Sequence, residues 1–280
     1  MDVSSPGWSP PPALLTSSPG WTPRRDLAPL RVRLGDLELH TVGQRKPGHG
    51  SWDMGIEDWS GWEESAPDDS STTPHRSGDG QVPGVPRLSP RPITLRGHIE
   101  ASEPWGSGSL TEALNTLARI RWGTLRVEER GGFAREADVR VTMLQTTRDG
   151  LDRAAYTLTL VADDPLRHGS DSMILRVGDN QVPNRGGAQA WPRIYIKSTK
   201  AGGSTTVGIV SPGGTFRVAV PDGEYVVDTR NGEVWDPVGQ RVLGVTTGPW
   251  PYVWPGGSKW TINSLTGMTE VRIDRFEAWS

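Results

Sequence analysis

The side chains that could carry acid–base chemistry are few and scattered along this sequence. No two of its five histidines stand at helical spacing, and one of them lies near a carboxylate in a strand-like segment. His98 and Glu100 alternate with apolar residues, so both side chains would share one face of a strand. Such a pair could transfer protons, but a paired strand surface is the commoner outcome. The histidines are His40, His49, His75, His98 and His168.

The signatures of covalent, metal and nucleotide chemistry are absent from the sequence. It has no G-x-S-x-G elbow, no H-E-x-x-H pair, no Walker A loop and no G-x-G-x-x-G fingerprint. Because it has no cysteine, it cannot form a disulfide framework, a zinc–thiolate site or a cysteine nucleophile. We therefore expect no catalytic residues, no cofactor and no metal, and hence no enzyme.

An acidic run between Asp53 and Asp69 contains no lysine or arginine. A calcium loop would follow the D-x-[DN]-x-[DN]-G spacing, which does not occur here and argues against a metal site. Two interpretations remain: a solvated acidic face, or a negative surface past which anionic cargo slides without binding. The candidate side chains are Asp53, Glu57, Asp58, Glu63, Glu64, Asp68 and Asp69.

Composition excludes several classes of protein. The formal net charge of −3 argues against a general or sequence-specific nucleic-acid binder, because such proteins present basic faces. No apolar run approaches the roughly 20 residues of a membrane span, and no basic segment precedes an apolar one at the start. We therefore expect neither a membrane span nor a signal peptide. Tryptophan is common, with 13 copies, and indoles favour contacts with partner subunits.

The elements that must position these side chains are organised around one helix. Ser109 and Glu112 have the spacing of a capping box at a helix start. Apolar residues recur from Leu110 to Leu117 at intervals of three and four, which is typical of an amphipathic helix. Gly123 could end it in the left-handed conformation. The pattern predicts a helix over 109–122 that covers one face of a β-sheet.

Alternation of apolar and polar residues predicts antiparallel strands elsewhere. Leu30–Thr41 is typical of a hairpin around a Gly-Asp turn, and Asn231-Gly232 is the strongest hairpin signal of the second half. Asp163-Asp164-Pro165 ends a strand, so we expect a domain boundary near His168. The predicted parts are a Pro/Gly/Ser-rich arm (1–28), a β domain with one helix and a long acidic loop at 43–85 (29–168), and a β-sandwich (169–280).

The arm contains a doubled motif, SSPGWSP at Ser4–Pro10 and SSPGWTP at Ser17–Pro23. Proline and glycine at this density exclude a helix or a central strand. The arm is either flexible or an extended segment whose Trp8 and Trp21 insert into a neighbouring subunit.

A set of short motifs follows a recognisable order between residues 30 and 280. They are Trp59-Ser60-Gly61-Trp62; Arg91, Ile93-Thr94-Leu95, Gly97 and Ile99; Asn184-x-Gly186 with Ala190-Trp191-Pro192-x-Ile194; Tyr225-x-x-Asp228-Thr229-x-x-Gly232-x-Val234; and Trp254-x-x-Gly257 before a last hairpin ending at Trp279. In this order the chain resembles the distal tail proteins, or minor tail proteins, of long-tailed non-contractile bacteriophages. The arginine bias over lysine resembles that of an actinobacterial phage. The doubled SSPGW arm is not part of the pattern.

The resemblance implies an N-terminal antiparallel β-sandwich or split barrel with one helix, and a C-terminal galectin-like β-sandwich. It implies a structural virion protein at the distal end of the tail, assembled as a ring, typically a homohexamer, that is open to DNA passage. Its implied partners are copies of itself, the tail tube protein, the tail hub protein, the tape measure protein and a receptor-binding protein. The acidic run would then face the lumen of the ring.

Two rival functions stay open at this point. One is a carbohydrate-binding adhesin of the tail tip, for which the candidate platform is Trp235, Trp250 and Trp254. The other is a different tail hub or tube component. The candidate contacts between subunits are Trp8, Trp21, Trp52, Trp59 and Trp62.

Overall fold

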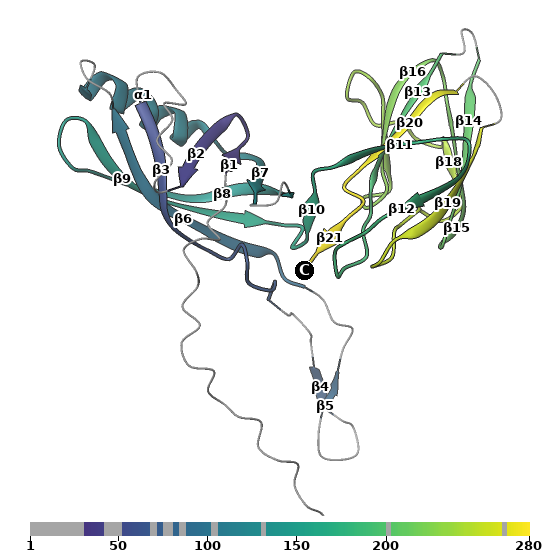
Figure 1. Ribbon diagram of the computed structural model, residues 1–280, viewed down its shortest axis with the longest axis horizontal. Helices are drawn as coiled ribbons and strands as arrows, with labels where there is room; N and C mark the ends of the chain where they lie inside the picture. The colour runs from purple at the N-terminus through teal and green to yellow at the C-terminus, as the bar shows by residue number, and fades with distance from the viewer. Residues whose placement is uncertain are drawn as a thin grey trace, which may run out of the picture.

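The computed structural model describes residues 31–41, 52–67, 72–74, 81–83, 88–101, 106–129, 133–199, 203–264 and 268–280. Strands dominate this part of the chain, which has one helix, so the predicted mainly-β class is confirmed. The buried apolar side chains form two separate cores. We call the elements around the first core the N-terminal module and those around the second the C-terminal module (Figure 1).

The N-terminal module is a nine-stranded sheet that closes on itself. Its order is β21-β10-β8-β7-β1-β2-β3-β6-β9, and β8 also pairs with β9. The long strand β8 makes closure possible, because Ala134–Arg140 pairs with β7 and Arg140–Arg148 pairs with β9. The strands are β1 (Arg31–Leu34), β2 (Leu37–Thr41), β3 (Trp52–Ser60), β6 (Arg91–Ala101), β7 (Trp122–Glu128), β8 (Ala134–Arg148), β9 (Arg153–Ala162), β10 (Arg167–Gly169) and β21 (Ala278–Trp279). A separate pair joins β4 (Thr72–Pro74) to β5 (Gln81–Pro83).

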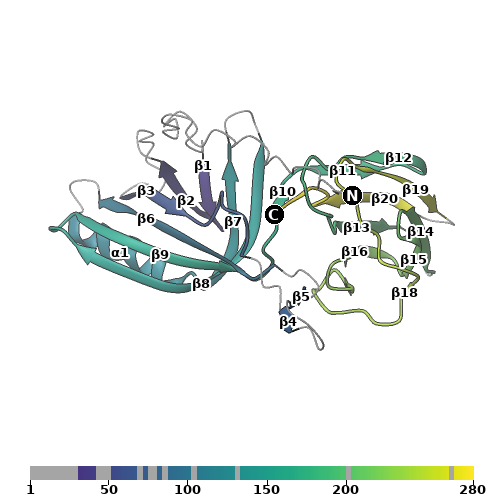
Figure 2. The same cartoon turned by 90° about the horizontal axis from the view of Figure 1, so that it is seen from below.

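Helix α1 (Gly106–Arg119) covers the inner face of this curved sheet against β3 and β6 (Figure 2). Leu110, Ala113 and Leu117 are fully buried, as the apolar spacing predicts. They meet alternate residues of β6 and β9, such as Leu95 and Leu158, in one core. Period-two burial on the strands and a helical stripe on α1 therefore produce a single apolar interior.

The C-terminal module is a sandwich of two five-stranded antiparallel sheets. One has the order β11-β20-β13-β16-β17 and the other β12-β19-β14-β15-β18. Ile194 and Ile273 from the first sheet share a core with Phe216 and Trp260 from the second. Its strands are β11 (Ser172–Leu175), β12 (Gly178–Val182), β13 (Arg193–Ser198), β14 (Thr205–Ser211), β15 (Gly214–Val220), β16 (Gly223–Asp228), β17 (Glu233–Trp235), β18 (Thr246–Thr247), β19 (Ser258–Ser264) and β20 (Met268–Asp274).

The helix boundaries differ from those predicted. The helix starts at Gly106, so Ser109 lies inside its first turn and does not cap it. It ends at Arg119, and Gly123 belongs to β7, where it pairs with Val139. Packing of the apolar face overrides the poor helix propensity of the glycines at the start. Pairing with β8 ends the helix earlier than the glycine signal suggested.

The predicted long loop over 43–85 is wrong for residues 72–74 and 81–83, which form β4 and β5, and for residues 52–60. Residues 52–60 form β3, which pairs with β6 along its length and with β2 in parallel. Trp52, Met54 and Ile56 alternate into the core, which is the period-two pattern of a half-buried strand. Gly55 pairs with His98, and Gly97 pairs with Ile56. A Cβ at Gly97 would lie 1.8 Å from the Gly55 carbonyl oxygen, so close strand contact requires glycine there.

Candidate functional site at the junction of the two modules

The structure places the predicted contact tryptophans inside the N-terminal module. Trp52 and Trp62 are only 5% and 1% exposed, and Trp59 stacks on Trp62 with ring centroids 6.3 Å apart. Little of the surface of Trp52 or Trp62 is accessible to a neighbouring subunit. Any role of these two residues in assembly would therefore be indirect, through the packing of the N-terminal module. Trp8 and Trp21 lie outside the described residues.

The acidic run that lacks basic residues in sequence meets basic residues in space. Its acidic groups fall on β3 and on the turn that follows, beside cations from β6, β8, β9 and β10. The charges are therefore partly compensated by strand pairing, a feature invisible in the linear sequence. The ion pairs are Asp58–Arg96 (3.9 Å), Glu57–Arg153 (4.0 Å), Glu63–Arg135 (3.5 Å) and Glu63–Arg167 (3.5 Å). Glu57 also forms a 2.8 Å hydrogen bond with His98 Nδ1.

The other candidates in the run show no common site. The Asp53 carboxylate accepts a hydrogen bond from the Met54 amide, and Glu64 is exposed, while Asp68 and Asp69 lie outside the described residues. His98 lies 3.5 Å from Glu100 in a paired strand surface. Among the described residues, no group of three His, Asp or Glu side chains is arranged to hold a metal ion.

Two buried arginines fix the turn after β3. Arg91 is 1% exposed and donates hydrogen bonds to the Pro165 carbonyl at 2.9 Å and the Gly61 carbonyl at 3.1 Å. Arg167 donates to the Trp62 carbonyl at 2.6 Å and to Ser280 at 2.8 Å. Burial, with repulsion from Arg135 and Arg91, lowers the pKa of Arg167 to about 10. This cluster ties the turn, the end of β9 and the C-terminal segment together.

A two-point ion pair joins the modules. Arg275, just after β20, donates from Nη1 and Nη2 to the two carboxylate oxygens of Asp138 on β8, at 2.6 and 2.8 Å. Its Nε lies 3.1 Å from Glu136, and Arg193 approaches Asp138 at 3.3 Å. Burial raises the pKa of Asp138, but hydrogen bonds from Arg275 and Thr124 outweigh it and the net shift is downward. Arg275 has a φ of 54°, the only positive φ outside glycine among the described residues.

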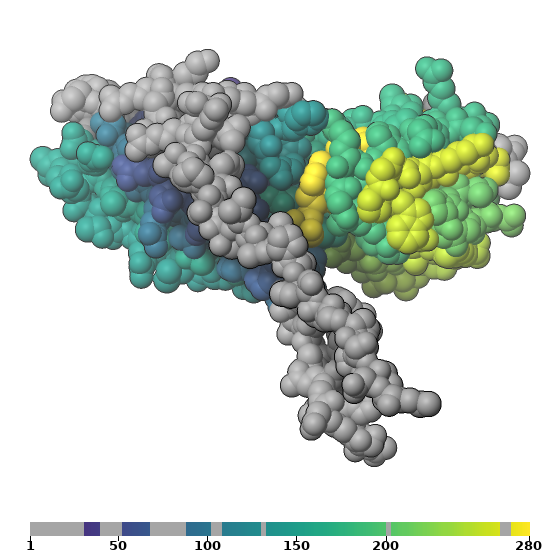
Figure 3. Space-filling view, turned by 60° about the horizontal axis from the view of Figure 1, so that its bottom comes forward, coloured from purple at the N-terminus to yellow at the C-terminus, as the bar shows by residue number. Residues whose placement is uncertain are grey.

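The end of the chain also crosses between the modules. β21 pairs with β10, so the last strand of the chain extends the sheet of the N-terminal module. Figure 3 shows yellow atoms from the end of the chain at the boundary between the two modules. The almost fully buried Glu277 accepts hydrogen bonds from Arg185 Nε at 2.5 Å and from Arg185 Nη2 at 2.7 Å. Asn184 accepts hydrogen bonds from the amides of Gly186 and Ala278. A Cβ at Gly186 would lie 1.8 Å from the Ala278 carbonyl oxygen, which requires glycine at this crossing.

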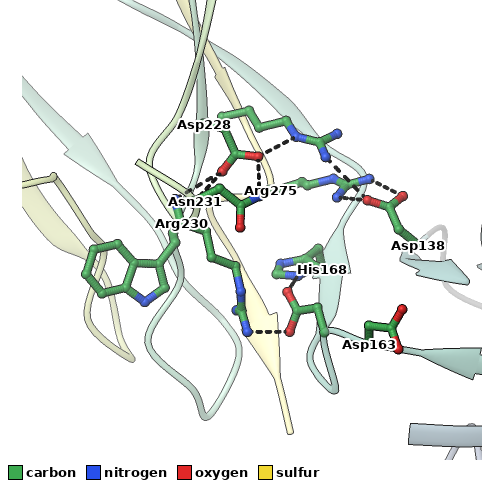
Figure 4. A pocket seen from close by; sticks show the side chains of 10 residues that line it. Asp138, Asp163, His168, Asp228, Arg230, Asn231 and Arg275 are labelled. Atoms are coloured by element: carbon green, nitrogen blue, oxygen red, sulfur yellow. Dashed lines mark hydrogen bonds and ion pairs between the residues drawn. The ribbon is translucent and has the colours of Figure 1, made fainter. Parts of the chain in front are cut away.

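A pocket of about 350 Å³ opens beside this junction (Figure 4). The N-terminal module contributes Asp138, Asp163, Asp164 and His168 to its wall. Asp164 binds His168 Nε2 at 2.8 Å and Arg230 at 2.7 Å. Burial raises the pKa of Asp164, but His168 and Arg230 outweigh it and the net shift is downward.

The C-terminal module supplies the opposite wall of the pocket. Trp191 forms an aromatic side, while Arg193, Arg230 and Asn231 present polar groups. Asp228 accepts bonds from the Arg230 and Asn231 amides, both at 3.1 Å, and from the Asn231 side chain at 3.0 Å. In the sequence, Asp163-Asp164-Pro165 and Asn231-Gly232 are recognisable only as turns. No local pattern indicates that these two turns lie close together in the fold.

The predicted carbohydrate platform is not brought together as one surface by any described contact. Trp254 is 47% exposed and packs edge-on against Tyr252, with ring centroids 5.1 Å apart. Trp250 is half-buried on Phe216, with centroids 5.0 Å apart, and Trp235 lies half-buried in β17. Trp191 instead packs against Tyr252, with ring centroids 5.3 Å apart, and lines the junction pocket.

No helix among the described residues has the length and apolar character needed to cross a membrane. The chain matches no family profile and no curated protein sequence. Solved structures do resemble it. The crystal structure of the Dit protein of phage SPP1, described as a paradigm of the hub adsorption apparatus in phages infecting Gram-positive bacteria, matches with a TM-score of 0.54 and 14% identity. The match covers 87% of this chain and 98% of the Dit chain.

A chain of the phage P2 baseplate in its activated conformation is also similar. It matches with a TM-score of 0.50 and 10% identity over 82% of this chain and 92% of that one. At these identities the likeness concerns the fold, which spans both modules rather than one. The chain thus shares the two-module β fold of phage Dit and baseplate proteins, in agreement with the resemblance seen in its motif order.

Proposed function

We propose that this protein is a structural component of a phage tail tip, at the distal end of the tail. The observation that carries the proposal is the fold match to SPP1 Dit over nearly the whole length of both chains. A fold match alone is an analogy. One feature of this chain supports it independently: part of one strand edge is left without a partner strand among the described residues.

The open edge belongs to β8. Residues 142–148 of β8 pair with β9 on one side, and no described strand occupies the other, because β7 pairs only as far as Arg140. Trp122, at the start of β7 beside this edge, is 82% exposed, and Leu151 in the β8–β9 turn is 76% exposed. An unpaired edge with exposed apolar side chains is a template for another chain. We propose that it meets a different surface of the next copy, as a closed ring requires.

The ring would be a hexamer that connects the tail tube protein to the hub, tape measure and receptor-binding proteins, with a lumen for DNA. We retain Glu57 and Asp58 as lumen-facing candidates, because their side chains are 53% and 69% exposed. Their partners Arg153 and Arg96 reduce the local charge, so repulsion of DNA would be weaker than the sequence run suggests.

Native mass spectrometry with particle imaging of the purified full chain tests the proposal. A ring with a central opening supports it, and a monomer at all concentrations and in the presence of tail tube protein contradicts it. Imaging also locates Glu57 and Asp58. Their appearance on the outer wall would overturn the lumen assignment while leaving the ring intact.

A further inference from the structure

The junction pocket has the composition of a ligand site that the proposed tail-tip function does not require. Its volume of about 350 Å³ lies at the lower end of the roughly 300–1,000 Å³ typical of small-molecule sites. Two modules converge on it, which is a common location for such sites. One wall is the half-buried indole of Trp191 and the other walls are polar (Figure 4).

The polar groups of the pocket are held in place by one another. Asp164 is fixed by His168 and Arg230, and Asp228 is fixed by the amides and side chain of its own turn. Side chains already locked by neighbours lose little conformational entropy when a ligand binds. The site is therefore organised before any ligand arrives.

Several polar atoms in this pocket still have bonding capacity. Asn231 uses its amide nitrogen on Asp228, and its amide oxygen has no hydrogen-bond partner in the described part of the chain. Arg193 and Arg230 each use one nitrogen at hydrogen-bonding distance, on Asp138 and Asp164, which leaves further N–H groups available. The wall therefore offers both hydrogen-bond donors and an acceptor.

The charge balance selects the class of ligand. Carboxylates in the wall disfavour a phosphate or another anion. The same carboxylates are paired with arginines, Asp138 with Arg193 and Arg275, Asp163 with Arg140, Asp164 with Arg230 and Asp228 with Arg193, which leaves little attraction for a cation. A neutral molecule with several hydroxyl groups and one apolar face fits both the polar walls and the indole.

We propose that the junction pocket binds a terminal neutral sugar of a glycan. The sugar's apolar face lies on Trp191, and its hydroxyls bond Asn231 and the guanidinium groups. The aromatic series continues from Trp191 to Tyr252 and Trp254, so further sugar units could follow it to the surface. This site differs from the platform predicted from Trp235, Trp250 and Trp254, since none of those residues lines the pocket.

Saturation-transfer NMR and tryptophan fluorescence titrations test this on the full chain, with glucose, galactose and N-acetylglucosamine as probes. Inorganic phosphate and a Ser-Pro-Gly-Trp-Ser-Pro peptide serve as alternative ligands. We expect saturable millimolar binding of at least one sugar, weakened about tenfold or more by Trp191→Ala and by Asn231→Ala. The matched control Trp122→Ala, which removes an exposed indole in the other module, leaves binding unchanged.

The proposal is overturned if no sugar gives saturable binding, if only phosphate or the peptide binds, or if the pocket variants bind as the wild type does. Circular dichroism checks that Trp191→Ala and Asn231→Ala are folded, so that a loss of binding by a folded variant reports on the site. Ring assembly is measured separately by native mass spectrometry. A ring without sugar binding rejects this inference alone, and sugar binding by a monomer rejects the assembly proposal alone.

Discussion

Arg275 and Asp138 lock the two modules through paired hydrogen bonds of 2.6 and 2.8 Å across the junction. Arg275 adopts a φ of 54° in making this contact, a conformation that costs a non-glycine residue about 1 kcal/mol or more. The bidentate geometry offsets that cost, because charge-assisted hydrogen bonds are the stronger class. The junction is therefore fixed by a specific side-chain pair in addition to the chain crossings.

Replacing Arg275 with lysine should lower the free energy of unfolding by about 2 kcal/mol, since one ammonium cannot satisfy both carboxylate oxygens. Water screens the half-exposed Asp138 side chain, which keeps the effect below that of a fully buried pair. Urea titration followed by circular dichroism measures it. Asp163→Asn, in the exposed Arg140–Asp163 pair, is the control and should cost under about 1 kcal/mol. Equal losses of unfolding free energy in both variants would show that the Arg275–Asp138 pair contributes no more than an exposed ion pair.

Acid should weaken the junction in a defined direction. The pKa values of Asp138 and Asp164 are lowered by folding, so their stabilisation is complete above the unfolded-state value of about 4. It is lost as pH falls below that value toward the folded-state pKa. Unfolding free energies measured from pH 7 to pH 2 should therefore decline below about pH 4. Asp138→Asn should flatten this decline, and a variant with the wild-type pH profile would contradict the assignment.

Exposed apolar residues at the β8 edge should matter for assembly and not for folding. Trp122→Ser is expected to change the free energy of unfolding by less than about 0.5 kcal/mol, because the indole is already exposed. It should nevertheless reduce the oligomeric fraction measured by light scattering. Leu151→Ser and Leu243→Ser form a matched pair, since both leucines are 76% exposed, but Leu243 lies in the C-terminal module. Only the former should weaken assembly.

Trp62 should be essential to the core of the N-terminal module. Trp62→Ala leaves a large cavity and should cost about 3–5 kcal/mol in unfolding free energy. Trp62→Phe should cost much less, because it keeps most of the volume and removes an indole N–H that is buried without a partner among the described residues. Thermal unfolding compares the two variants. Similar melting temperatures for both would show that Trp62 is not a packing residue.

Local patterns in the sequence predict much of this fold. The hairpin over 31–41 and the turn at Asn231-Gly232 are present, and Gly35 and Gly232 have the positive φ that these turns demand. The division at 168 and 169 stays a prediction. The existence of the helix follows from its apolar stripe, but its ends do not, because strand pairing and packing set them.

The candidate site could not be predicted in the same way. The pocket forms where the end of β9 meets the β16–β17 turn, more than sixty residues away along the chain. Each turn has an adequate local explanation, so neither points to the other. The compensation of Glu57 by Arg153 likewise depends on which strands become neighbours. Such long-range pairings are properties of topology that linear spacing does not contain.

The pairing of β21 with β10 has a mechanical consequence. With a single linker, the C-terminal module could rotate relative to the N-terminal module, and a force on the C-terminal module would act on one covalent connection. Here the chain leaves the sheet of the N-terminal module after β10 and returns to it as β21. A force applied to the C-terminal module is therefore shared by two covalent connections. The two covalent connections and the β10–β21 pairing therefore hold the C-terminal module against the N-terminal sheet more firmly than one linker would.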